Sequence, residues 1–174
     1  MGKRWRYGLA SVTDSQTTPT RLRQHNLLEY QDEDVFVALE SVVPIAEQIF
    51  QTRLPHLIER ARTKRRALLN LALDSEQVVG FKLGYERSEE VFYSWLGGVL
   101  PQARGHGVAW ELMRRQHEQC GAAGYQEVLT ETKNIYRSML ILNLKFGFDL
   151  IGTWTDHDGQ PKLMLRKYFT VPSP

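Results

Sequence analysis

The sequence predicts a single α/β (α+β) domain in which helices flank a mixed, mostly antiparallel sheet of six to seven strands. The chain of 174 residues is 42% hydrophobic and 24% charged, which is typical of one ordinary globular domain. In its middle, three strand-like runs follow one another across short polar turns, which favours an antiparallel meander. A strand, a glycine-rich turn, a helix and another strand come next, and this order predicts a right-handed parallel crossover.

The N-terminal part is expected to contain an arm and then the start of the domain. Residues 1–19 show no periodicity and are predicted to be a flexible arm, and residues 20–170 to be the domain. One strand and two amphipathic helices are expected first, and Pro44 is expected to kink or break the longer helix. They run from Arg21 to Tyr30, from Val35 to Phe50 and from Leu54 to Lys64.

The rest of the domain is expected to alternate between meander, crossover and hairpin. The helix after the glycine turn has apolar residues on one face from Val108 to Cys120. A turn signal at residues 156–159 predicts a closing hairpin. The expected strands are Ala67 to Leu73, Gln77 to Glu86, Val91 to Leu100, Tyr125 to Thr132, Asp149 to Thr155 and Lys162 to Phe169, with a short helix from Tyr136 to Phe146.

Composition excludes several classes of protein. No apolar run approaches the roughly 20 residues that span a bilayer, and the first fifteen residues lack the apolar stretch of a secretory signal. We therefore expect a cytoplasmic protein with no membrane partner. A net charge of +2 does not indicate nucleic acid, although residues 60–66 are locally basic. We interpret this run as a solvated helix end, with contact to an acidic substrate or to the phosphates of a cofactor as the alternative. Cys120, the only cysteine, falls on the apolar helix face and is expected to be buried.

The turn from Arg104 to Ala109 is the strongest functional signal. It brings unpaired backbone N–H groups to the start of a helix, where the helix dipole is positive, and its glycines allow the backbone to approach phosphate oxygens. No Gly-Lys-Ser/Thr is present, which excludes a P-loop. The dinucleotide fingerprint is also incomplete, because Trp110 stands where its third glycine would be.

The turn resembles the acetyl-CoA site of the GNAT superfamily of N-acetyltransferases. That family has Arg/Gln-x-x-Gly-x-Gly/Ala after a strand that ends in Val-x-Pro. Val99 and Pro101 fix the frame here, so that Arg104, Gly107 and Ala109 match the motif. The other frame, with Gln102, Gly105 and Gly107 in the motif positions, misplaces the strand end.

A second motif of the family lies downstream, with two departures. Met139 and the pair Gly147-Phe148 match the family's short helix and its end. Tyr136 stands where the family often has an asparagine, and Asn134 comes two residues earlier. Asn143 stands where many members have a tyrosine that protonates the departing thiolate. This departure leaves the source of that proton open between water, Tyr136 and the incoming ammonium group.

The resemblance implies that the cofactor is acetyl-CoA, with the pantetheine arm along residues 97–101. A backbone N–H of Val99 or Leu100 would then polarise the thioester carbonyl. Gly97-Gly98 would allow this close approach, and a simple bulge is the alternative. The predicted cofactor contacts are Val99, Leu100, Pro101, Arg104, Gly105, His106, Gly107, Val108, Ala109, Asn134, Met139 and Asn143.

The general base is less well defined by the sequence. Tyr93 occupies the place where some family members have a glutamate, and a tyrosine is no base at neutral pH. Glu131 is the best carboxylate by position and Glu86 the second, while a water relay is an open alternative. Tyr85, Tyr93 and Trp95 are the expected acceptor contacts. His106 is expected beside the phosphates and His117 at the surface, and the histidines show no metal-ligand spacing, so we expect no metal.

Three functions follow from these observations, in order of preference. The first is transfer of an acetyl group from acetyl-CoA to a primary amine of a small molecule, peptide or protein, by direct attack in a ternary complex. The second is a catalytically silent acyl-CoA-binding module. The third is a nucleotide-binding protein that uses the same turn. The resemblance also implies that a homodimer is an open option.

Overall fold

The computed structural model describes residues 26–169. The predicted arm, residues 1–19, and the beginning of the strand predicted from Arg21 lie outside these residues. The described part forms one seven-stranded sheet in the order β1-β2-β3-β4-β5-β7-β6. The strands are β1 Asn26–Gln31, β2 Arg65–Asp74, β3 Gln77–Glu86, β4 Val91–Val99, β5 Glu127–Lys133, β6 Asp149–Thr155 and β7 Pro161–Tyr168.

The strand pairings agree with the predicted mixed sheet. β1 to β4 pair antiparallel as a meander, and β5, β7 and β6 also pair antiparallel. Only the central β4–β5 pair is parallel, because α3 carries the chain back to the other end of the sheet. The described helices are α1 Glu33–Phe50, α2 Leu57–Arg62, α3 Val108–Ala122 and α4 Arg137–Lys145, with a 3-10 turn at Pro101–Ala103.

Pro44 does not break α1, although a kink or a break was predicted there. The helix runs through it from Glu33 to Phe50. Pro44 lacks the N–H that would bond the carbonyl of Glu40, but both residues lie on the exposed side of the helix, where water can satisfy that carbonyl. The opposite side, which includes Val35, Leu39 and Val42, is fully buried against the sheet and holds the helix in place.

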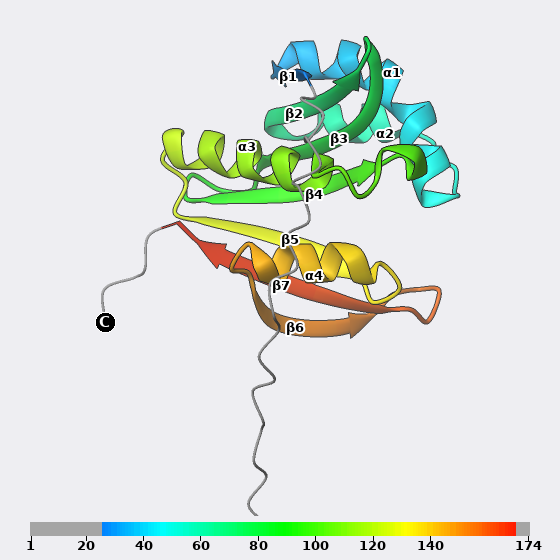
Figure 1. The fold of residues 1–174 in the computed structure, drawn as a ribbon. Helices are drawn as coiled ribbons and strands as arrows, with labels where there is room; N and C mark the ends of the chain where they lie inside the picture. The colour runs from blue at the N-terminus through cyan, green and yellow to red at the C-terminus, as the bar shows by residue number, and fades with distance from the viewer. Residues whose placement is uncertain (1–25, 170–174) are drawn as a thin grey trace, which may run out of the picture.

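The helices cover both faces of the sheet. α1 packs on β2 and β3 through a core that includes Leu69, Leu71 and Phe81. α3 packs on the other face, where Val108 and Leu112 meet Ala72 and Val79. Figure 1 shows α3 and α4 on either side of the β4–β5 junction, with α1 and α2 beyond β3. Among the described residues, no helix combines the length and apolar character needed to cross a membrane.

The β4–β5 junction, which we call the seam, is closed along only part of its length. Residues Val91 to Ser94 pair with Glu127 to Thr130. Beyond Ser94 no further β4–β5 pair forms, and the two strands diverge (Figure 1). The β3–β4 register shifts at the same point, because Leu83 faces Leu96 while Gly84 faces Ser94, so that Trp95 forms a bulge. The seam therefore has a closed part and an open part, and Trp95 stands between them.

Candidate functional site

The open part of the seam exposes one side of the β4 backbone. The N–H of Leu100 donates to the carbonyl of Val79 at 2.9 Å, so this amide belongs to the β3 side. Alternate residues of a strand point their polar groups to opposite sides, which directs those of Val99 into the seam. The Val99 carbonyl accepts a hydrogen bond from Arg104 Nε at 3.0 Å. Of the two amides predicted to polarise a thioester, Leu100 is thus already engaged and Val99 is the one that remains.

The two glycines before Val99 have different surroundings. A Cβ added to Gly98 would lie 2.7 Å from Ile49 Cγ2, because α1 crosses the strand at this point. At Gly97 the nearest atom would be the Phe81 carbonyl oxygen at 3.3 Å. Gly98 is therefore needed for helix packing, a reason that the sequence did not reveal. The bulge proposed for this pair lies at Trp95 instead.

The glycine turn is open to solvent and its amides are free to bind. Residues from Arg104 to Gly107 are exposed. Gly105 and Gly107 have φ angles of +80° and +79°, which glycine adopts without steric cost. Gly107 is the N-cap of α3 and provides no side chain to cap it. Within the described residues, no backbone hydrogen bond is donated by residues 105–109. These amides at a helix start fit phosphate oxygens.

α4 borders the open seam on the other side. Asn143 is 2% exposed and is the buried residue of this helix, and its backbone carbonyl accepts hydrogen bonds from the N–H groups of Phe146 and Phe148. Met139, one helical turn earlier, packs partly into the core. Tyr136 precedes the helix, and its ring lies 6.2 Å from that of Phe50 at the end of α1. Asn134 is exposed and donates its backbone N–H to Pro161.

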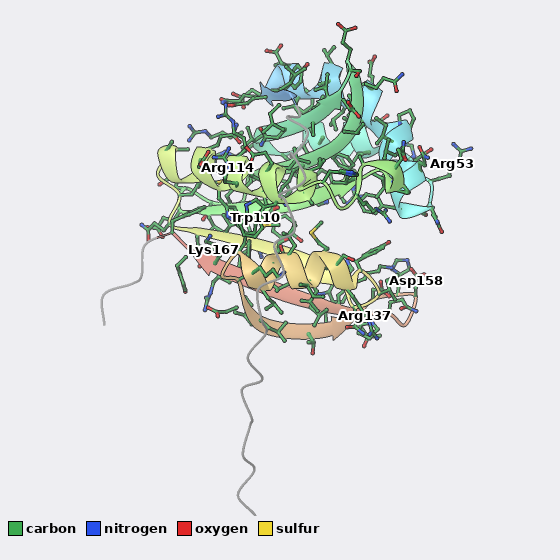
Figure 2. The ribbon with its side chains drawn as sticks, in the orientation of Figure 1. Arg53, Trp110, Arg114, Arg137, Asp158 and Lys167 are labelled. Carbon is green, nitrogen blue, oxygen red and sulfur yellow. The ribbon has the colours of Figure 1, made fainter. Side chains whose placement is uncertain are left out.

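Trp110 is a residue of this region whose contact the sequence analysis missed. It is 46% exposed in the first turn of α3, and its ring centroid lies 4.2 Å from that of Phe146, the residue that caps the end of α4. Figure 2 places Trp110 between the two helices. An exposed tryptophan right after a phosphate-type turn was the available signal, but its partner comes from 36 residues later in the chain.

The three predicted acceptor residues do come together beside the seam. The ring of Tyr85 lies 5.3 Å from that of Tyr93 and 5.7 Å from that of Trp95, measured between centroids. We call these three residues the aromatic floor. Burial, and secondly the Glu131 carboxylate, raise the pKa of Tyr93 above its ordinary value. Burial likewise raises the pKa of Tyr85. Both phenols therefore remain protonated at neutral pH.

Glu131 lies where the seam opens. It follows Thr130, the last β5 residue that pairs with β4. Its electrostatic influence on Tyr85 and Tyr93 places it near the aromatic floor. The side chain is 21% exposed, and its nearest cation is Lys162 Nζ at 3.7 Å. This carboxylate is well placed to accept a proton from an amine bound beside the aromatic floor.

Glu86 is the last residue of β3, and it pairs with Phe92 in the closed part of the seam. Its carboxylate is 3.2 Å from Arg65 and 3.4 Å from Arg66, and it accepts a hydrogen bond from Tyr125 Oη at 3.1 Å. The side chain is only 3% exposed. This location and these partners argue against the predicted role of Glu86 as a general base and indicate a structural role.

His117 is buried, and its predicted surface position is wrong. It is 7% exposed and lies among the rings of Phe146, Phe148 and Phe169. Burial, followed by the charges of Lys167 and Lys82, lowers the pKa of His117 to about 3. Figure 2 shows Lys167 at the edge of this region. The histidine escaped prediction because the covering rings come from α4 and from the last part of the chain.

Other buried polar groups lie under α3. Burial lowers the pKa of Lys82 to about 8. Gln116 is fully buried, and neither polar atom of its side chain has a partner among the described residues. Cys120 is 1% exposed, and burial raises the pKa of its thiol to about 12, as expected for an unreactive core cysteine. Within residues 26–169 no His, Cys, Asp and Glu side chains cluster as a metal site.

Comparison with known proteins identifies the fold and the family. Residues 44–129 match the family model described as the acetyltransferase (GNAT) domain. The chain belongs to the GNAT superfamily. This span runs from the middle of α1 to β5 and includes the glycine turn, so it contains the first of the two motifs found in the sequence, while the second lies beyond it. The GNAT family and fold support acetyl transfer from acetyl-CoA in general terms, without identifying an acceptor.

Solved GNAT structures share the fold at low sequence identity. The ribosomal-protein-S18-alanine N-acetyltransferase from Escherichia coli is 11% identical, with a TM-score of 0.71 over 85% of this chain and 97% of its own. The IAA acetyltransferase from Bacillus cereus is 15% identical, with a TM-score of 0.69 over 83% of this chain and 100% of its own. A GNAT family acetyltransferase from Elizabethkingia anophelis with acetyl-CoA bound is 14% identical, with a TM-score of 0.63 over 83% of this chain and 99% of its own. No curated protein matches the sequence.

Proposed function

We propose that this GNAT protein transfers the acetyl group of acetyl-CoA to a primary amine by direct attack within a ternary complex. The acceptor is a small molecule, a peptide or a protein. The observation that carries the proposal is the combination of an open seam, a free Val99 N–H inside it and an exposed glycine turn at its end. The aromatic floor and Glu131 lie beside the same opening.

The glycine turn is the part of the site that would hold the pyrophosphate. Its free amides from Gly105 to Ala109 converge at the positive end of the α3 dipole. Arg104 adds a cation, although its Nε is held by the Val99 carbonyl. Asn143 of α4 is the proposed side-chain hydrogen-bond partner of the bound cofactor, because its amide can both donate and accept.

Acetyl-CoA supplies its acetyl group as a thioester. In the proposed reaction the amine nitrogen forms a bond to the acetyl carbon, the carbon–sulfur bond breaks, the amine loses a proton and the thiolate gains one. The N–H of Val99 is placed to stabilise the negative charge that develops on the carbonyl oxygen. Loss of one such donor costs about 3 kcal/mol in other enzymes.

Proton transfer is assigned to Glu131 on the amine side. An alkylamine has a pKa near 10, so a bound ammonium group must be deprotonated before it attacks. Tyr93 and Tyr85 cannot accept this proton, because their pKa values are raised and they are already protonated. On the thiolate side, Tyr136 or water is the proposed proton donor, since Asn143 has no acidic proton.

Binding and turnover together test the proposal. Isothermal titration calorimetry with CoA and acetyl-CoA should give heat in both cases, and a panel of primary amines should release CoA thiol from acetyl-CoA. Binding without thiol release across the panel would support the silent-module alternative. Absence of any CoA heat would overturn the assignment, and thermal protection by ATP or NAD but not by CoA would favour a nucleotide-binding protein.

A further inference from the structure

Three basic side chains cover the aromatic floor. Arg60 Cζ lies 5.2 Å from the ring centroid of Trp95. Lys64 Nζ lies 4.9 Å from that of Tyr85 and 5.9 Å from that of Trp95. Arg87 Cζ lies 5.9 Å from that of Tyr93. We call Arg60, Lys64 and Arg87 the basic rim. They come from α2, from the segment after it and from the turn after β3, so the fold assembles them.

The basic rim lacks ion-pair partners, whereas eight of the other fourteen arginines and lysines in residues 26–169 have one. Elsewhere the described arginines and lysines commonly form ion pairs, for example Arg53 with Glu47, Arg115 with Glu29 and Lys133 with Asp156. Arg60, Lys64 and Arg87 make no ion pair within residues 26–169. The nearby carboxylate of Glu131 has its own cation, Lys162.

We propose that the acceptor amine belongs to a molecule that also carries a carboxylate, so that this enzyme prefers acidic acceptors. This inference rests on the proposed function and specifies its substrate class. The basic rim pairs with the carboxylate, the aromatic floor covers the apolar part of the acceptor, and Glu131 receives the ammonium group. Charged groups about 4 Å apart near a protein surface interact by several kcal/mol before desolvation, which is enough to set a preference.

Cation–π stacking on the aromatic rings is a simpler role for the same cations, because it needs no ligand. A cation over an aromatic face contributes about 0.5–1 kcal/mol at an exposed site, whether or not a ligand binds. Arg62 provides the comparison within the same helix, because its Cζ lies 4.9 Å from the Phe36 ring. Arg62 is exposed, makes no ion pair among the described residues and lies over a ring outside the aromatic floor. Arg62 therefore shares the positive charge and the ring stacking of the basic rim, but it does not lie over the aromatic floor.

The test uses two short peptides that differ only in having glutamate or glutamine after the N-terminal residue. Their amines have similar basicity, so differences in KM report on the side-chain charge. Initial rates of CoA release are measured at saturating acetyl-CoA. We expect a KM about tenfold lower for the acidic peptide, a preference that 0.5 M salt reduces. Lys64→Gln and Arg87→Gln should each remove most of this preference.

Arg62→Gln is the matched control, because it removes one positive charge from the same region and should retain the full preference. Equal KM values for the two peptides, with normal turnover, would overturn the inference and leave the proposed function intact. An equal loss of preference in Arg62→Gln would also overturn it, because net charge alone would then explain the effect. No CoA release with any amine would overturn the proposed function, and this inference with it.

Discussion

The closed and open parts of the seam use the same two strands for different purposes. In the closed part, four residue pairs join β4 to β5, and the nearby carboxylate of Glu86 forms ion pairs with Arg65 and Arg66 and accepts a hydrogen bond from Tyr125. In the open part, the N–H of Val99 and the amides of the glycine turn have no partner in the described chain. Unpaired backbone N–H groups are thus accessible where the strands separate, and it is there that a ligand can bind, whereas the unpaired side-chain atoms of Gln116 and His117 are buried.

The sharpest test of this contrast compares one glutamate from each part. Glu131→Gln should lower kcat about 10²- to 10³-fold, because it removes the proposed proton acceptor without changing its shape. Glu86→Gln should leave kcat nearly unchanged and lower the free energy of unfolding by about 2 kcal/mol, because its buried ion pairs are lost. Steady-state kinetics and urea unfolding measure the two effects. Unchanged kcat in Glu131→Gln would instead favour the water relay.

Acid should weaken the packing over the closed seam through His117. The folded pKa of about 3 is below the ordinary 6.5, so the unfolded chain binds the proton first as pH falls. The stability associated with neutral His117 is therefore complete above about pH 6.5 and declines toward pH 3. We expect a loss of roughly 3 kcal/mol by about pH 4.

His117→Leu should flatten this part of the pH–stability curve, as measured by urea unfolding at several pH values. His157 is the control, because its side chain is 90% exposed. His157→Leu should retain the slope of the unmodified protein. An identical slope in both variants would show that His117 is accessible to protons in the folded state.

Gly98 of β4 should prove necessary for the packing of α1 on this strand. Gly98→Ala places a Cβ 2.7 Å from Ile49 Cγ2 and should lower the free energy of unfolding by about 2 kcal/mol. Combining it with Ile49→Ala should cost less than the sum of the two single changes, because the clash disappears. Strict additivity in a double-mutant cycle would mean that α1 does not press on the strand at this point.

The smallest expected effect compares two glycines at opposite ends of α3. Gly105 and Gly124 have φ angles of +80° and +86°, and an added Cβ would meet no atom within 4 Å at either position. Gly105→Ala and Gly124→Ala should therefore lose similar stability, about 1 kcal/mol each. Only Gly105→Ala should also raise the Kd for acetyl-CoA, by about tenfold, as measured by calorimetry. Equal affinities would remove the glycine turn from the proposed cofactor site.

The sequence predicted the architecture well but the site only in part. The meander, the parallel crossover and the final hairpin follow from apolar periodicity and turn residues, which act over short distances. The prediction failed where distant segments decide the environment. Pro44 is tolerated because of the side of α1 that it occupies, and His117 is buried by rings that follow it by 29 to 52 residues.

The sequence by itself determined the strand, the glycine turn and the helix that begins after it, because glycine, proline and apolar spacing dictate local backbone geometry. The tertiary structure alone decided which groups remain unpaired. It engaged Leu100 with Val79 and left Val99 facing the seam, put Glu86 among arginines and Glu131 at the opening, and gathered the basic rim over the aromatic floor. Hydrogen bonds and charges are satisfied or left free by neighbours that are far away in the chain, and these neighbours exist only once the sheet has formed.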